Sequence, residues 1–135
     1  MVPTEDEKET LADLGLALHE VQVTEHFMRT ILLFVLQKPR SGGLNAAAWD
    51  ADSALLVRMT MGNLIVTLRS RVDLHPGFET TLTAFLKDRN TLAHNLNTVG
   101  DPHTEEGRKA LRKFVVLLMG NLDVVAKVFG SLLLA

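Results

Sequence analysis

The chain has 135 residues, a formal net charge of −2 and no cysteine. This length fits a single domain, residues 1–135, and the lack of cysteine excludes disulfides, thiol nucleophiles and thiolate metal sites. Almost half of the residues are hydrophobic (47%) and few are aromatic (5%), a mixture that favours helices packed on helices over a sheet. We therefore expect an all-α protein without a global attraction for nucleic acid.

The first predicted helix runs from about residue 4 to residue 37. Thr4 can cap this helix, with Glu7 three positions later as in a capping box. Apolar residues then recur at helical spacing until Pro39, which ends the helix because a residue before proline resists helical backbone angles. Ser41-Gly42-Gly43 follows as a flexible connector, and the structure of the 39–52 segment stays open.

A second helix is predicted to begin between Asn45 and Ser53 and to continue to about Val72. The chain then breaks at residues 73–77, where Pro76 suits the first turn of a third helix. This third helix extends to about Leu96 and carries the most informative stretch of the sequence, Arg89-Asn90-Thr91-Leu92-Ala93-His94.

Within the third helix, Arg89 takes a place in the apolar stripe. A buried guanidinium needs a carboxylate, water or a protein–protein seam. One reading is structural: the stem of Arg89 packs on its apolar neighbours and its head pairs with Asp88, Asp73 or Glu79. The other places Arg89 in a functional cleft. Asn90 and His94 lie four residues apart on one face, so the amide can hydrogen-bond the imidazole.

The fourth predicted helix begins at Thr104 and continues to the last residues. The stretch 114–135 is long enough to cross a membrane, but Asn121, Asp123 and Lys127 interrupt its centre at a high cost in hydrocarbon. The first residues are acidic and do not resemble a secretory signal. We expect a cytoplasmic protein with no membrane span, a largely buried last helix and an antiparallel four-helix bundle.

No metal site or activated nucleophile is evident. His19 and His26 lie seven residues apart in the first helix, which is not the four-residue spacing of a helical zinc site. The serines and threonines are scattered without a partnered base. We expect neither a metal nor another cofactor.

The stretch Phe85-Leu86-Lys87-Asp88-Arg89-Asn90-Thr91-Leu92-Ala93-His94-Asn95 resembles the Arg-x-x-x-x-His signature of the HEPN superfamily, in the "RNxLAH" form of many small bacterial members. Met61-Gly62-Asn63-Leu64-Ile65 and Thr104-Glu105-Glu106-Gly107-Arg108 fit the preceding and following helices. The resemblance spans roughly residues 55–118 and implies a HEPN-like fold. The chain departs from the pattern at Leu96, where toxin-type members often carry a tyrosine.

The resemblance implies a homodimer that cleaves RNA without a metal ion, using the 2′-hydroxyl of the RNA as nucleophile. In that chemistry His94 is the general acid or base, Arg89 holds the scissile phosphate, and Asn90 orients His94 or binds a phosphate oxygen. Such members act in toxin–antitoxin or defence systems, some with a nucleotidyltransferase-type antitoxin partner. The alternative is a non-catalytic dimerisation or interaction module that binds a nucleotidyltransferase or another protein, since fold alone does not decide function.

Because the net charge is negative, RNA binding would need a local basic patch. The densest candidate lies in the first turns of the fourth predicted helix and comprises Arg108, Lys109, Arg112 and Lys113. The alternative is that these four residues simply line the solvated side of a helix.

Overall fold

The computed structural model describes residues 2–36, 58, 60–70 and 72–132. In these residues the chain is helical and contains no strand. The helices are α1 (Glu5–Leu36), α3 (Met61–Arg69), α4 (Pro76–His94), the 3-10 helix η1 (Leu96–Thr98) and α5 (Glu105–Leu132). The prediction of an all-α chain is confirmed. The predicted start of the second helix and the 39–52 segment lie outside the described residues.

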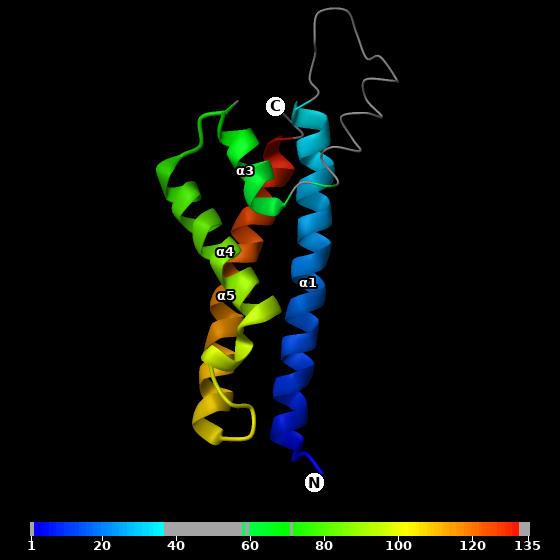
Figure 1. Ribbon diagram of the computed structural model, residues 1–135, viewed down its shortest axis with the longest axis vertical. Coiled ribbons are helices and arrows are strands. Elements are labelled where there is room, and N and C mark those ends of the chain that lie inside the picture. Colours follow the sequence, from blue (N-terminus) through cyan, green and yellow to red (C-terminus); the bar gives the residue numbers. More distant parts are fainter. Residues whose placement is uncertain (1, 37–57, 59, 71, 133–135) are drawn as a thin grey trace, which may run out of the picture.

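Three long helices, α1, α4 and α5, form the body of the molecule, and the short α3 packs at one end (Figure 1). Figure 1 shows α1 and α5 side by side and running in the same direction, and these two helices make the most extensive contact. Helix α4 runs the opposite way along α5. The alternation expected of an antiparallel bundle is therefore seen between α4 and α5 but not between α1 and α5.

The helix starts follow from local capping. The Thr4 hydroxyl accepts a hydrogen bond from the Glu7 amide at 3.2 Å, and the Thr104 hydroxyl accepts one from the Gly107 amide at 3.0 Å. Each threonine thus satisfies a backbone donor that has no partner inside its own helix. Pro76 occupies the first turn of α4, where its missing amide hydrogen costs nothing. These three predicted starts are confirmed.

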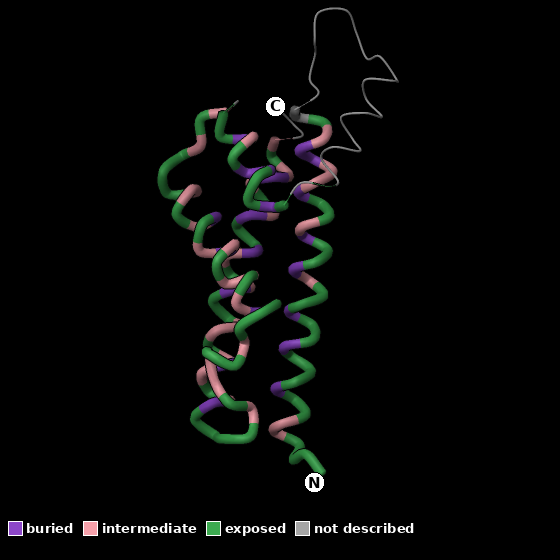
Figure 2. The backbone as a smooth tube through the Cα atoms, in the orientation of Figure 1, coloured by how far each residue is buried: buried purple, intermediate pink, exposed green. Residues whose placement is uncertain are grey.

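One hydrophobic core joins the four α-helices. Phe85 of α4 and Phe129 of α5 are fully buried, and the ring of Phe78 lies tilted against Phe129 with centroids 6.4 Å apart. Figure 2 shows the buried positions of α1 on the side that faces the other helices. Each such side chain contributes roughly 1.5–3 kcal/mol on burial, so the core holds α4 against α5.

Helix α5 is buried on one side only. Its core side includes Leu118, which is fully buried, whereas Val116, Leu117 and Val124 on the outer side are exposed. The expectation of a largely buried last helix is therefore wrong for this outer side, because α1 and α4 are the described helices that pack most extensively against α5. By length and composition α5 could cross a membrane, but the core helix of a soluble protein passes the same test.

Candidate functional site

Arg89 reaches from α4 to α1 and forms a two-point ion pair with Glu25. Its Nε and Nη2 donate to the two carboxylate oxygens of Glu25, the second at 3.2 Å. The Arg89 side chain is 30% exposed and that of Glu25 is 13% exposed. The guanidinium of Arg89, which lies in the apolar stripe of α4, is thus paired with a carboxylate and still reaches the protein surface.

The three carboxylates that the sequence offered as partners are not paired with Arg89. Glu79 instead binds Arg69 of α3, with Nε to Oε1 at 3.2 Å. Burial raises the pKa of Asp88, an effect that nearby Lys87 partly offsets. Glu25 lies 64 positions away from Arg89 in the chain, so no rule of helical spacing could have identified it. The only signal in the sequence was an acidic residue beside the apolar stripe of the first helix.

Asn90 binds Arg89 and not His94. The Asn90 side-chain oxygen accepts a hydrogen bond from Arg89 Nη1 at 2.9 Å, and no hydrogen bond joins Asn90 to His94 in the described residues. Glu25 and Asn90 together therefore take three of the five N–H groups of the guanidinium, leaving two without an acceptor in the described part of the chain. The hydrogen bond between Asn90 and His94 that their spacing allows is therefore not formed in the described structure.

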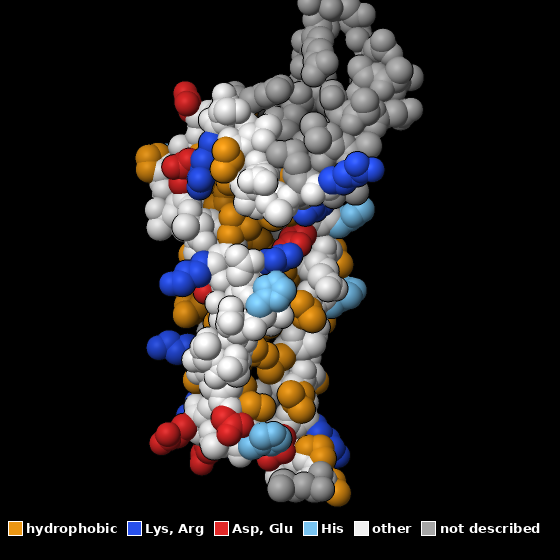
Figure 3. All heavy atoms as spheres, in the orientation of Figure 1, with side chains coloured by type: hydrophobic (Ala, Val, Ile, Leu, Met, Phe, Trp, Pro, Cys, Tyr) orange, Lys and Arg blue, Asp and Glu red, His pale blue; other side chains and the backbone are white. Residues whose placement is uncertain are grey.

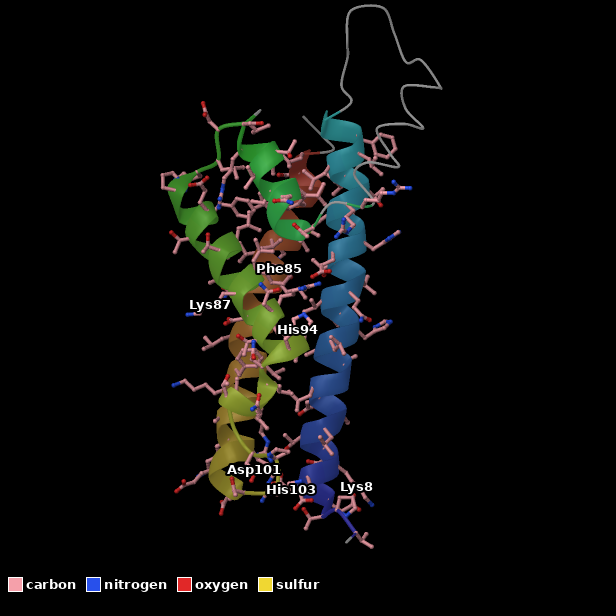
Figure 4. All side chains as sticks on the ribbon, in the orientation of Figure 1. Lys8, Phe85, Lys87, His94, Asp101 and His103 are labelled. Atoms are coloured by element: carbon pink, nitrogen blue, oxygen red, sulfur yellow. The ribbon has the colours of Figure 1, made fainter. Side chains whose placement is uncertain are left out.

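His94 is the last residue of α4 and is exposed. Figure 4 shows it at the end of α4 that approaches α1. Five residues of helix separate His94 from Arg89 by about 7.5 Å along the axis and about 140° around it. The two side chains therefore leave α4 in different directions and can act on one substrate only if it bridges both directions.

The surface of α1 beside this pair is partly apolar. Leu11 and Leu18 precede Glu25 at intervals of seven residues, which places all three on one side of α1. Both leucines are exposed, at 49% and 38%. Figure 3 shows hydrophobic, positive, negative and histidine side chains mixed on the face that it presents. The face shown is thus neither strongly basic nor strongly acidic.

The predicted basic patch is half neutralised. Arg108 and Arg112 of α5 both donate to the carboxylate of Asp6 in the first turn of α1, and Arg108 also donates to the Pro102 carbonyl at 3.0 Å. Lys109 and Lys113 are exposed. From Asp6 to Glu25 the helix α1 rises about 28 Å, so the structure does not bring this basic cluster to Arg89 and His94.

Among the described residues, neither metal-ligating side chains nor a depression in the surface adds to this site. No group of three His, Cys, Asp or Glu side chains in the described part of the chain could hold a metal ion. A shallow depression of about 690 Å³ lies where α3 meets the first half of α4. Its lining residues are Arg69, Pro76, Glu79, Thr80, Thr83, Ala84 and Lys87. It contains none of Arg89, Asn90 and His94.

Comparisons with the models of known protein families, with curated proteins and with solved structures find no match to this chain.

Proposed function

We propose that this protein is a HEPN-like endoribonuclease that cleaves RNA without a metal ion and acts as a homodimer. One observation carries the proposal: Arg89 lies within the apolar stripe of α4, is held by Glu25 and Asn90, and keeps two N–H donors free in the described structure. A fixed guanidinium with free donors suits a phosphate, because its planar donors match two phosphate oxygens at once. The exposed imidazole of His94 on the same helix supplies a group that can accept or donate a proton.

The proposed reaction is a transesterification within the RNA. The 2′-oxygen loses its proton and bonds to the adjacent phosphorus, while the bond from phosphorus to the 5′-oxygen of the next nucleotide breaks. The products are a 2′,3′-cyclic phosphate and a free 5′-hydroxyl. His94 takes the proton of the 2′-hydroxyl or protonates the departing 5′-oxygen. Arg89 stabilises the negative charge that grows on the phosphate oxygens.

Homodimerisation is proposed because one chain carries a single His94, whereas the reaction needs both a base and an acid. In a two-fold dimer, two copies of Arg89 and His94 face one groove and divide these roles. The apolar side of α4 is already used inside the chain, where Leu82 and Phe85 are fully buried. The exposed Leu11 and Leu18, on the same side of α1 as Glu25, are the better apolar contribution to a dimer interface. A HEPN-like arrangement of the helices, a cytoplasmic location and a toxin–antitoxin or defence setting are parts of the same proposal.

A direct test incubates the purified protein with structured RNA in excess EDTA, beside an Arg89→Ala/His94→Ala double variant. We expect the parent to cleave, to leave 2′,3′-cyclic phosphate ends and to spare a DNA of the same sequence, which lacks the attacking hydroxyl. The double variant should be inactive. Cleavage that needs a divalent ion, or a double variant as active as the parent, would refute the proposal.

The second candidate is a non-catalytic interaction module that binds a nucleotidyltransferase-type or other protein partner. It is favoured by the charge distribution: Glu25 neutralises Arg89, and Asp6 neutralises Arg108 and Arg112. A protein whose arginines are largely satisfied internally has little long-range attraction for RNA. A parent that is a stable dimer but cleaves no RNA in the assay above would favour this second function.

A further inference from the structure

The guanidinium of Arg89 is bound on one edge and open on another. Glu25 takes the Nε hydrogen and one Nη2 hydrogen, and Asn90 takes one Nη1 hydrogen. One N–H therefore remains on each of the two terminal nitrogens. A guanidinium can bind two oxygens of one phosphate through this pair of nitrogens. With 30% of the side chain exposed, an RNA phosphate can reach these donors while Glu25 stays in place.

Glu25 is anchored more firmly than the arginine it binds. It lies in the middle of α1, between Thr24, which is 6% exposed, and Met28, which is fully buried. Its own side chain is only 13% exposed. Arg89, in contrast, has a long flexible stem, and a guanidinium without a partner samples many directions. Holding it in one direction before the substrate arrives removes the need to order it during binding.

We infer that Glu25 is a positioning residue that directs the two free N–H donors of Arg89 toward one phosphate of the RNA backbone. This inference rests on the proposed function and adds to it a residue of α1. The opposite role is that Glu25 imitates a phosphate and must leave Arg89 before RNA can bind. Glu25 is largely buried and lies in the middle of α1, which argues against a release of its carboxylate from Arg89. The released carboxylate would remain close to the incoming phosphate.

The two roles predict opposite results for Glu25→Gln. A glutamine keeps the size but has one acceptor oxygen in place of two, so it cannot bind Nε and Nη2 together. If Glu25 positions Arg89, the variant should bind a labelled single-stranded DNA oligonucleotide, which is not cleaved, about tenfold more weakly than the parent. If Glu25 competes with phosphate, the variant should bind more tightly. Glu20→Gln is the control, since Glu20 lies on the same helix and has no ion pair in the described structure.

A purely structural effect is separated from positioning in two ways. The thermal midpoint of each variant is measured first, and binding is compared well below it. Glu25→Gln is then repeated in an Arg89→Lys background, where the two-point geometry is already lost. Positioning predicts that Glu25→Gln weakens binding much less there than in the parent, whereas general loosening of the fold predicts the same loss in both backgrounds.

The outcomes for the inference and for the proposed function differ. Unchanged or tighter oligonucleotide binding by Glu25→Gln overturns the inference alone. A parent that binds the oligonucleotide through Arg89 and Glu25 but cleaves no RNA overturns the nuclease and leaves the positioning role intact. A parent that binds no oligonucleotide overturns the inference, and the RNA cleavage assay then decides the nuclease separately.

Discussion

Gly107 of α5 lies directly against the backbone of Asp101. A β-carbon on Gly107 would stand 1.8 Å from the Asp101 carbonyl oxygen, far inside van der Waals contact. The loop that follows η1 is thus folded tightly onto the first turn of α5, and the Thr104 amide donates to the same carbonyl at 3.2 Å. This close approach sets the direction in which α5 leaves the loop and runs back beside α1.

Gly107→Ala should therefore destabilise the protein, because the backbone of the loop must move to make room. Overpacking of this kind costs about 1–3 kcal/mol or more. Gly120→Ala is the matched control: no atom lies within 4 Å of its added carbon, so the gain in helix propensity should stabilise by roughly 0.5–1 kcal/mol. Thermal midpoints of the two variants should move in opposite directions. Equal shifts would contradict the close contact.

The carboxylate of Asp6 should weaken RNA binding by the basic residues of α5. Asp6→Asn removes the charge that binds Arg108 and Arg112, so the protein should lose about 1 kcal/mol yet bind RNA severalfold more tightly, with a steeper dependence on salt. Glu5→Gln makes the same change in net charge at the neighbouring position, where Glu5 pairs only with Lys8 of its own helix. Fluorescence anisotropy with a labelled RNA compares the two. Equal binding would contradict the view that Asp6 keeps Arg108 and Arg112 from binding RNA.

The features that sequence predicted best are those set by neighbours in the chain. Thr4 and Thr104 cap their helices because the amide that each satisfies is three residues away. The position of Arg89 in the stripe of α4 follows from helical periodicity alone. Its partner Glu25 could not be predicted, since that contact depends on how α4 docks against α1. The pairing of Asp6 with Arg108 escaped prediction for the same reason, as it needs α1 and α5 to begin at one end of the molecule.

At neutral pH the protein should be less stable with Asp88 than with asparagine at the same position. Burial raises the pKa of Asp88 above its usual 3.8, so the folded chain holds this proton more tightly than the unfolded chain. The stability that this tighter proton binding contributes is complete below about pH 3.8. It is lost as the pH rises through the pKa of Asp88 in the folded protein. Asp88→Asn should thus raise the thermal midpoint at pH 7, and the difference from the parent should vanish in acid.

Asp73→Asn, the same substitution at an exposed position, serves as the control for Asp88. A gain from Asp88→Asn that stays constant between pH 7 and pH 3 would show that the buried charge is not its cause.

Shortening a side chain to alanine should have different effects on the two sides of α5. Leu118→Ala removes a fully buried side chain and should cost about 2–5 kcal/mol. Leu117→Ala changes a side chain that is 57% exposed, and the effect should stay within about 0.5 kcal/mol. Urea titration measures both, on protein purified without detergent. Extraction only with detergent would instead mean that α5 lies in a membrane.

Arg89→Lys should separate charge from geometry at the candidate site. Lysine keeps the positive charge, but its compact ammonium cannot bind both oxygens of Glu25 and the oxygen of Asn90 in one plane. We expect a folded protein whose thermal midpoint is lower and whose RNA cleavage is strongly impaired. Arg69→Lys is the control, because the Arg69–Glu79 pair is more exposed, at 40% and 41%, and such pairs contribute little.

His94→Ala completes this comparison, since His94 is exposed and its loss should leave the fold unchanged. Its cleavage rate should fall roughly 10²–10⁴-fold, the usual contribution of a general acid or base. A rate loss without a stability loss at His94, beside a loss of both at Arg89, is the pattern expected when His94 acts only in chemistry and Arg89 also joins two helices. If Arg89→Lys and His94→Ala both cleave like the parent, the function of this surface is to bind a protein.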